Sequence, residues 1–503
     1  MSNEIEFKEM SPSSFFQKNK QLCGFDNPIK SAYTSFRELF ENSLDACEIA
    51  QVQPKIQTQI NTMKDGMYSF IIIDNGLGVP PQHVANAFGK VFYGSKYELR
   101  QHRGELGMGG KMALLNSLVE TDKPYRIVTA TPDGQLIFAF TMGIDLLKNE
   151  PIVYNIDRKQ NKTKWRGLGI QLYTKSNFPS AINRILTYLD FTTIVCPYIT
   201  VTLTKDKELI FQHKATTNKI PVRPKVVSYH PHGVDLPILK ALISSSKQNN
   251  LLKFLCTSFQ RIGGETARKF LTYTNLTPET NPKKLNRQEL LLLVEKLQSF
   301  DDFLSPDISC LSPITEEIFL NGIKMKFQPD FCVYSQRRGV HTGHPIIVEC
   351  VIAIGGNIVT VVEKRLPEPY RFANKIPLLY DKGNCALYKV VRSIYPSAYK
   401  LSEGVKVAIF LNASSTHIPY KTVGKEYISP DYSEINNLIG NALKDALRKV
   451  KVYMSQRGRR EYEAKKKSIF DIYLPLIAES LSPLAEKPVN ELNDLLHSCL
   501  EGE

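Results

Sequence analysis

The sequence predicts an α+β multidomain protein, and three observations lead to this fold class. A chain of 503 residues is too long for one hydrophobic core, and its length suggests roughly three or four domains. Residues 1 to about 215 mix strand and helix patterns without strict βαβ alternation, which favours layered α+β packing. Residues 238–303 read as helices, and strand patterns return before a helix that begins near Ser433.

Composition narrows the class of protein further. The chain has 64 Lys and Arg against 50 Asp and Glu, a formal charge of +14, which favours an anionic partner such as nucleic acid. Contact with a ribosome or an acidic lipid surface would leave the same signature. The nine cysteines include no C-x-x-C pair, which predicts a reducing compartment and no zinc site. No apolar run approaches the roughly 20 residues that span a bilayer, and no signal-peptide core precedes the motifs, so we expect an intracellular protein without membrane contact.

The first distinctive element is RELFENSLDACEIA, residues 37–50, which predicts an amphipathic helix with an unusual polar face. Its apolar residues recur at the spacing of one buried stripe. Glu38 and Asn42 are four residues apart, so the carboxylate and the carboxamide lie on one face. Such a pair can orient a water molecule and hold a metal ion. A merely solvated helix face is the structural alternative.

The next element, YSFIIIDNGLGVP, predicts a strand that ends at Asp74. Gly76 and Gly78 allow the backbone to turn tightly beside the carboxylate. A carboxylate held there can accept a hydrogen bond from an exocyclic amine, the group that distinguishes adenine from guanine. An ordinary hairpin is the alternative interpretation.

A glycine-rich stretch, GELGMGG, then precedes the helical pattern KMALLNSLVE. Its four glycines leave backbone N–H groups able to converge on an anion, and the following helix presents its positive end to the same point. The stretch lacks the G-K-[ST] ending of a Walker loop and the tight βαβ unit of a Rossmann fingerprint. We therefore predict a phosphate cradle of another type.

For the later part of the chain the sequence predicts secondary structure only in outline. LLKFLCTSFQRIGGETARKFL predicts two helices around a glycine turn, and RQELLLLVEKLQSF predicts a third. HPIIVECVIAIGG, NIVTVVEKRLPEPYRFANKIPLLY and KVAIFLNA predict strands. The long helix that follows becomes very basic: residues 444–467 hold ten Lys and Arg against three acidic residues, a net of +7. This segment could contact DNA, dock a partner protein or simply be solvated.

In this order, an E-x-x-x-N helix, a D-x-G-x-G turn and a G-x-x-G-x-G lid resemble the GHKL (Bergerat) ATP-binding sandwich of gyrase, heat-shock chaperones, sensor histidine kinases and mismatch-repair ATPases. The resemblance implies that Glu38 polarises the attacking water, Asn42 holds Mg²⁺ against the triphosphate of ATP, and Asp74 reads adenine. Phosphoryl transfer to water needs such positioning and charge neutralisation. The implied remaining ATP contacts are Gly78, Lys96, Gly104, Glu105, Leu106, Gly107, Met108, Gly109, Gly110 and Lys111.

Further blocks narrow the resemblance to the B subunit of topoisomerase VI, a type IIB DNA topoisomerase. FQRIGGETARKF, CLSPITEEIFLNGIK and HIPYKTVGKEYI are similar to its corresponding blocks, and the matching blocks keep their order from Lys30 to about Lys451. The resemblance implies a GHKL ATPase domain over residues 1–220 and a helix-two-turns-helix domain over 221–305. It also implies an α/β transducer domain with a long helical stalk over 306–470 and a C-terminal helical tail over 471–503.

The implied function is an ATP-hydrolysing subunit that dimerises on ATP as a gate for duplex DNA. A partner A subunit would supply the DNA-cleaving tyrosine, in an A2B2 heterotetramer, in the cytoplasm and nucleoid or in a eukaryotic nucleus. The alternative is a non-catalytic ATP-dependent clamp for a similar cleaving subunit. Glu38 favours the enzyme, because a pure clamp does not need a water-polarising carboxylate.

The family inserts one transducer lysine into the ATP site, and HIPYKTVGKE contains two candidates. We expect Lys425 to be this lysine, with Lys421 as the second choice; a solvated loop lysine is the structural alternative. Three positions depart from the family pattern. Glu41 stands where Asp is usual, Lys111 where a small hydroxyl residue is usual, and Leu168 where Thr often lies near the nucleotide.

Overall fold

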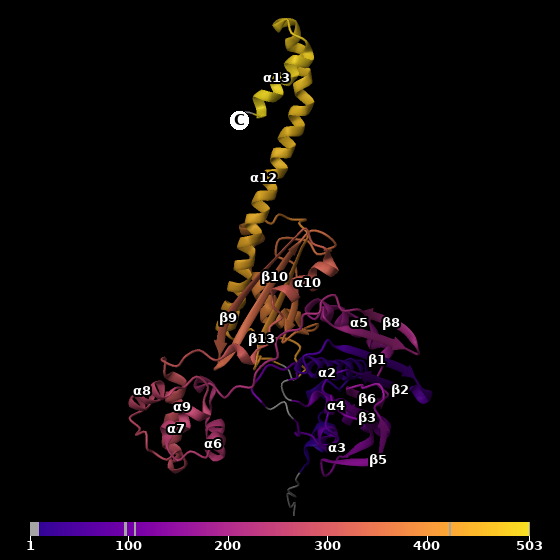
Figure 1. Ribbon diagram of the computed structural model, residues 1–503, viewed down its shortest axis with the longest axis vertical. Helices are drawn as coiled ribbons and strands as arrows, with labels where there is room; N and C mark the ends of the chain where they lie inside the picture. The colour runs from indigo at the N-terminus through magenta and orange to yellow at the C-terminus, as the bar shows by residue number, and fades with distance from the viewer. Residues whose placement is uncertain (1–9, 95–97, 105–106, 422–423, 502–503) are drawn as a thin grey trace, which may run out of the picture.

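In the computed structural model, which describes residues 10–94, 98–104, 107–421 and 424–501, two sheet-containing regions and one helical region pack together. Figure 1 places the first sheet and the helical region side by side at one end, the second sheet above them, and one long helix projecting to the far end. The predicted α+β multidomain fold class is confirmed. None of the helices in these described ranges is long and apolar enough to cross a membrane.

The first region is built on a mixed eight-stranded sheet with the order β5-β4-β3-β6-β2-β1-β7-β8. Only β1 and β7 are parallel neighbours. In β1 buried and more exposed residues alternate, as expected for a sheet with one face packed on helices. The strands are β1 (Lys55–Thr62), β2 (Tyr68–Ile73), β3 (Tyr125–Ala130), β4 (Leu136–Asp145), β5 (Glu150–Gln160), β6 (Gly167–Thr174), β7 (Thr200–Lys205) and β8 (Glu208–His213).

Helix α2 (Pro28–Ile49) lies at the centre of the helical layer on this sheet. It contacts β2 of the sheet and packs between α4 (Gly109–Thr121) and α5 (Phe178–Val195). Its first turn is capped by the side chain of Asn27, which accepts hydrogen bonds from the backbone N–H groups of Ile29 and Lys30 at 2.8 and 3.3 Å. The layer is completed by α1 (Pro12–Lys18) and α3 (Pro81–Gly89).

The helical region has its own small core. Large aromatic side chains such as Phe254, Phe270 and Phe300 are buried within it. Its helices are α6 (Leu236–Ser245), α7 (Leu251–Ser258), α8 (Gly264–Thr274) and α9 (Arg287–Ser299), and the predicted glycine turn separates α7 from α8.

The second sheet has five strands in the order β12-β11-β13-β10-β9, with α10 (Glu316–Phe327) and α12 (Ser433–Ala485) packed against its strands. Strands β11 and β13 are parallel and α11 (Ala386–Ser393) connects them, which makes a βαβ unit. The prediction of strands over residues 357–380 is confirmed only for residues 370–373 and 376–377: residues 357–369 form no strand, and Val361 makes one isolated bridge to Lys406. The strands are β9 (Phe331–His341), β10 (His344–Ile354), β11 (Tyr370–Ala373), β12 (Ile376–Pro377) and β13 (Val407–Ser415).

The two sheet regions share one hydrophobic core rather than a thin polar contact. Helix α10 packs on α5, and a Cβ atom at Gly322 of α10 would lie only 2.1 Å from the carbonyl oxygen of Ile194. Phe319 and Phe410 of the second region are buried in the same cluster as the residues that line the first sheet. Because a close-packed core transmits displacements, a movement of one region would shift side chains of the other.

Helix α12 is 53 residues long, about 80 Å at 1.5 Å per residue. One face of the helix between Ile435 and Val450 is buried against the second sheet, whereas the rest of the helix is mostly exposed and projects as a stalk. The helix continues past residue 470, where the sequence predicts the start of a separate tail. At its far end α13 (Val489–Glu501) folds back and covers Leu474 and Ala478.

Candidate nucleotide site

The polar face of α2 is buried, so the interpretation of a solvated helix face is excluded. Glu38 is 7% exposed and Glu41 only 1%. Tertiary packing buries these carboxylates, because one side of α2 lies on the sheet and the other side meets a loop of the second region. Carboxylates that are removed from water in this way need cationic or hydrogen-bonding partners.

Two cations meet the Glu38 carboxylate. Arg37 donates from Nη2 to Glu38 Oε1 at 2.7 Å, and its Nη1 donates to the carbonyl oxygen of Gly424 at 2.9 Å. Lys425 places Nζ at 3.6 Å from Glu38 Oε1 and 3.2 Å from Glu41 Oε2. A loop of the second region thus reaches the helix that carries the E-x-x-x-N motif.

The same geometry separates the two candidate lysines. Burial lowers the pKa of Lys425, but the carboxylates of Glu38 and Glu41 more than offset this and raise it above its usual value. Lys425 therefore carries its charge at the site. Lys421 is instead more than half exposed and pairs with Asp431 at 2.6 Å.

Glu41 is the second carboxylate at this point. Burial raises its pKa, against the lowering effect of Lys425. The hydroxyl of Tyr188 donates to Glu41 Oε1 at 3.2 Å. The departure from Asp at this position thus provides a carboxylate that reaches both Tyr188 and Lys425.

The glycine-rich lid rests directly on the motif residues of α2. A Cβ atom at Gly109 would lie 1.7 Å from Glu38 Oε2, and one at Gly110 would lie 2.7 Å from Asn42 Nδ2, so only glycine permits this approach. Helix α4 begins at Gly109, and its N-cap residue Met108 makes no side-chain cap. The N-terminus of α4 therefore has the uncapped geometry that suits a phosphate.

Asp74 lies at the end of β2 and is 2% exposed. Its Oδ1 accepts hydrogen bonds from the backbone N–H groups of Gly76 at 2.9 Å and Leu168 at 3.1 Å. Burial raises its pKa to about 6. The contact from position 168 comes from the backbone, so replacement of the usual Thr by Leu168 does not remove it. Gly78 has a positive φ of 65°, and a Cβ atom there would lie 2.3 Å from the carbonyl oxygen of Ala130.

Lys111 is buried, and its Nζ donates to the carbonyl oxygen of Tyr93. Burial lowers the pKa of Lys111 to about 8. Three predicted ATP contacts, Lys96, Glu105 and Leu106, lie outside the described residues.

A cleft of about 730 Å³ opens between α2, the lid and the loop that carries Lys425. The predicted site residues on its wall are Glu38, Gly104, Gly107, Met108, Gly109, Lys421 and Lys425. Asn42, Asp74, Gly78, Gly110 and Lys111 do not line it. The cleft thus corresponds to the phosphate end of the predicted site, and the predicted adenine end lies beneath the surface.

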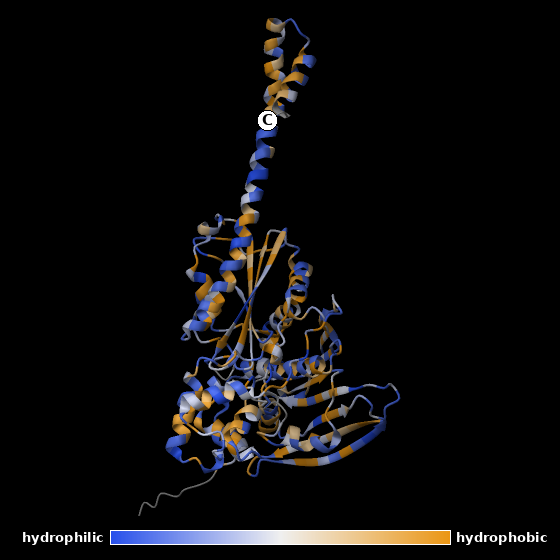
Figure 2. Cartoon of the chain, turned by 60° about the vertical axis from the view of Figure 1, so that its left-hand side comes forward, coloured by the Kyte–Doolittle hydropathy of each residue, from blue (hydrophilic) through white to orange (hydrophobic). Residues whose placement is uncertain are grey.

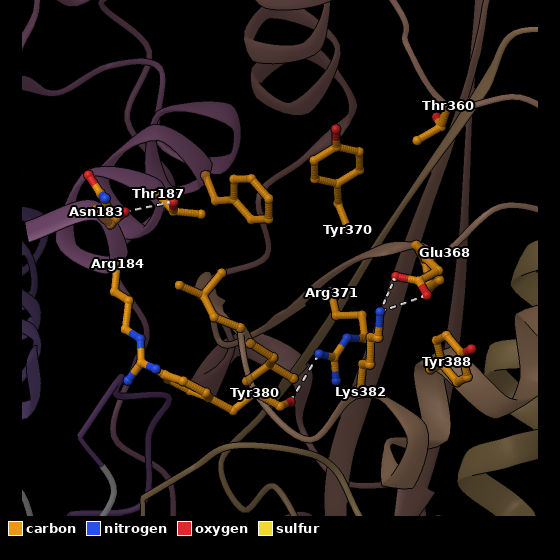
Figure 3. Close-up of a pocket in the computed structure, with 14 residues that line it drawn as sticks. Asn183, Arg184, Thr187, Thr360, Glu368, Tyr370, Arg371, Tyr380, Lys382 and Tyr388 are labelled. Atoms are coloured by element: carbon orange, nitrogen blue, oxygen red, sulfur yellow. Dashed lines mark hydrogen bonds and ion pairs between the residues drawn. The ribbon is translucent and has the colours of Figure 1, made fainter. Parts of the chain in front are cut away.

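Another cleft, of about 550 Å³, lies between α5 and the segment around β11 (Figure 3). Arg184 stands on one side, while Arg371 donates to the carbonyl oxygen of Tyr380 at 3.0 Å and Lys382 pairs with Glu368 at 2.8 Å on the other. None of the predicted site residues lines this cleft. This cleft is therefore separate from the predicted nucleotide site.

Sequence reasoning missed several residues that the fold brings to α2. Arg37 and Tyr188 hold the two carboxylates, and Arg103 and Lys375 hold Glu48, ten residues after Glu38 on the same helix. Only Arg37 was accessible to sequence reasoning, because it adjoins Glu38. The other three come from distant parts of the chain.

Comparison with known proteins agrees with this architecture. Residues 306–467 match the family model described as the transducer of the topoisomerase VI B subunit. The B subunit of the type 2 DNA topoisomerase 6 of Saccharolobus solfataricus is 38% identical over 488 residues, which cover 96% of this chain and 91% of the relative. The corresponding protein of Saccharolobus shibatae is 38% identical over 498 residues, 98% of this chain and 93% of the relative.

Among solved structures, the ATPase and transducer domains of DNA topoisomerase II from Balamuthia mandrillaris are 9% identical, with 91% of this chain and all of that chain covered. The TM-score is 0.40, too low to support a conclusion about this chain. The fold defines the class: an α/β region that carries the predicted nucleotide site, joined to a transducer. Within that class, the chain belongs to the family of topoisomerase VI B subunits, and the resemblance inferred from the sequence is confirmed.

Proposed function

We propose that the chain is the ATP-binding and ATP-hydrolysing B subunit of a type IIB DNA topoisomerase, and that it acts as an ATP-operated dimer gate for duplex DNA. The contact between Lys425 and the carboxylates of Glu38 and Glu41 is the observation that carries this proposal. It joins the helix that carries the hydrolytic motif to the region that holds the stalk. A nucleotide at α2 would therefore change a contact that the transducer itself makes.

Glu38 is the group we assign to the attacking water. Its partners Arg37 and Lys425 fix the orientation of the carboxylate. Lys425 has a second role in this assignment, because its Nζ is the transducer cation positioned for the γ-phosphate. The N-terminus of α4 and the lid glycines supply backbone N–H groups to the phosphates.

Asn42 is the residue we assign to Mg²⁺. The described residues contain no group of three or more His, Cys, Asp or Glu that could hold a metal ion by itself. Mg²⁺ prefers oxygen ligands and keeps waters and phosphate oxygens in nucleotide sites, and the carboxamide oxygen of Asn42 would be one ligand among these. When bound, the ion would neutralise charge on the phosphate oxygens.

Asp74 is the residue we assign to adenine. Two backbone N–H groups on Oδ1 hold the carboxylate in one orientation, as a specificity contact requires. Burial raises the pKa of Asp74 to about 6, so the acceptor is only half charged near pH 6 and becomes mostly charged as the pH rises above that value.

A DNA-cleaving A-like subunit is the partner we propose, seated at the far end of the stalk. The tip formed by α12 and α13 exposes large apolar side chains, with Ile472 61% and Leu476 53% exposed. Figure 2 places this hydrophobic tip beyond a hydrophilic length of α12. An apolar surface at the end of the projecting stalk suits a permanent protein partner better than it suits DNA, whose backbone is anionic.

The experiment that tests the function combines the chain with an A-like subunit and supercoiled plasmid. The wild-type chain should support ATP-dependent relaxation, whereas Glu38→Gln should bind ATP without supporting it. Ile472→Asp with Leu476→Asp should lose the A-like subunit while the isolated chain still binds nucleotide. A wild-type complex that closes on ATP but never hydrolyses it would favour the alternative, a non-catalytic clamp.

A further inference from the structure

A second contact between the transducer and α2 lies about 15 Å along the helix from Glu38, ten residues at 1.5 Å each. Lys375, in the turn between β11 and β12, donates from Nζ to Glu48 Oε2 at 2.6 Å. The other carboxylate oxygen, Oε1, accepts from Arg103 at 2.6 Å and from the hydroxyl of Tyr198 at 2.5 Å. Arg103 also donates to Asp45 at 3.0 Å. We call these five residues the Glu48 network.

The network is buried and its charges balance. Arg103 and Lys375 are each 3% exposed, and Glu48 and Asp45 are 6% and 7% exposed. Two cations face two carboxylates. Burial alone would raise the pKa of Glu48, but Arg103 and Lys375 lower it to about 2, so the carboxylate stays charged. Removal of any one of these charges would leave an uncompensated charge in the interior.

The charged members of the network come from three parts of the fold. Arg103 comes immediately before the lid, which begins at Gly104. Glu48 belongs to α2, the helix of the hydrolytic motif. Lys375 belongs to the transducer. Beside it, Asn374 donates from Nδ2 to the carbonyl oxygen of His102 at 3.1 Å. The same turn therefore also contacts the residues just before Gly104.

The turn that carries Lys375 is tied to the centre of the second sheet. The backbone N–H of Lys375 donates to Asn412 Oδ1 at 3.1 Å, and Asn374 exchanges hydrogen bonds with the backbone of Ser415 at 2.9 and 3.0 Å. Asn412 and Ser415 belong to β13, which pairs with β10, and α12 packs on β10. A displacement of Lys375 is thus transmitted to the base of the stalk through paired strands.

The backbone of the turn supports a role for the side chain. Asn374 and Lys375 have positive φ values of 49° and 66°. A two-residue hairpin turn of this kind prefers glycine at its second position, so lysine there is held at a conformational cost. The conformation of the turn does not require a lysine. The contact of Lys375 Nζ with Glu48 does require a long cationic side chain at this position.

We propose that Lys375 and Glu48 are positioning residues that couple the transducer to the nucleotide site: when a nucleotide binds beside α2, Arg103 and Glu48 move together and Lys375 carries the base of the stalk with them. The proposal rests on the proposed ATP-operated gate and adds a second, fixed contact to the one made by Lys425. Lys425 meets the phosphate end of the site, while the Glu48 network lies outside the catalytic residues.

The test uses the full chain and a double-mutant cycle. Lys375→Met and Glu48→Gln each leave one buried charge unpaired, so each should lower the thermal unfolding midpoint. The double variant restores the charge balance, because Arg103 and Asp45 remain, and should recover most of that midpoint. If the pair positions the transducer, the double variant should still need at least tenfold more of the non-hydrolysable analogue AMP-PNP to dimerise, while its affinity for ADP stays within threefold of wild type.

A distance measurement reads the stalk directly. Cys499 is an exposed cysteine on α13, so spin labels there report the separation of the two stalk tips in the dimer formed with AMP-PNP, with Cys499→Ser as the labelling control. Wild type and Lys375→Arg should give one narrow distribution, and the double variant a broad one. Tyr198→Phe is the matched control, since it removes a hydrogen bond to Glu48 but leaves the contact with Lys375, and it should keep the narrow distribution.

The outcomes separate this inference from the proposed function. A double variant that recovers its unfolding midpoint and also dimerises and positions its stalks like wild type would overturn the inference alone, because the network would then be only structural. A wild-type chain that stays monomeric in AMP-PNP would overturn the proposed gate and this inference with it.

Discussion

Replacement of Lys425 by Met provides the sharpest test of the site. The change removes the cation that lies 3.2 Å from Glu41 and 3.6 Å from Glu38 and keeps the length of the side chain. At an effective dielectric constant of about 20, each of these charge pairs corresponds to about 5 kcal/mol before the desolvation of the ammonium is subtracted. Breaking one partner of a buried ion pair typically costs about 3–5 kcal/mol.

Two features of the site reduce this cost. Arg37 remains beside both carboxylates, at 2.7 and 3.5 Å. Burial also raises the pKa of Glu41, and loss of Lys425 would raise it further, so this carboxyl can take up a proton in the folded variant. We expect Lys425→Met to lose about 3 kcal/mol of unfolding free energy at pH 8. The loss should shrink as the pH falls, because the raised pKa of Glu41 lets the folded variant bind the extra proton.

The assay compares urea unfolding and steady-state ATP hydrolysis for three chains. In Lys425→Met, kcat should fall by about 100-fold, as expected when one cation at a developing phosphate charge is removed. Lys421→Met is the matched control: Lys421 is exposed and paired only with Asp431 among the described residues, so both quantities should stay near wild type. A Lys425→Met chain with kcat within twofold of wild type, or a Lys421→Met chain with the larger loss, would refute the assignment.

Four further predictions concern hydrolysis, gating, adenine recognition and DNA. Glu38→Gln should keep ATP binding and lose hydrolysis by at least about 100-fold in a phosphate-release assay, because the amide keeps the shape without the basicity; an unchanged rate would disprove the role. AMP-PNP should convert the isolated chain from monomer to dimer in light scattering, and an unchanged mass would contradict the gate. ATP affinity measured by calorimetry should fall below about pH 6 as Asp74 is protonated, whereas Asp74→Asn should bind weakly at every pH, with Glu38→Gln as the control that retains the pH dependence. Neutralising Arg457, Arg459 and Arg460 on the stalk should flatten the dependence of log DNA affinity on log salt by up to roughly 3; an unchanged slope with loss of the A-like subunit would assign this segment to the protein interface.

Much of the fold was readable because its signals are local. The apolar spacing that predicts α2, the run that ends at Asp74 and the glycines before α4 each occupy one short stretch, and their order along the chain indicated the nucleotide site. The first part of the stretch predicted as strands, residues 357–369, failed for the opposite reason. Its β-branched residues have suitable propensity, but whether they pair depends on a neighbouring strand elsewhere in the chain.

The sequence by itself determined the candidate chemistry: a carboxylate and a carboxamide one turn apart, a carboxylate at a strand end, and a glycine lid. Only the tertiary structure decided which distant residues complete that chemistry. Lys425 and Glu41 are separated by 384 positions, and Lys375 and Glu48 by 327. Hydrophobic periodicity reports how one element faces its core, whereas a buried ion pair depends on which elements the fold brings together. The resemblance could rank Lys425 ahead of Lys421, but no local pattern could have identified the carboxylates that Lys425 meets or the contact made by Lys375.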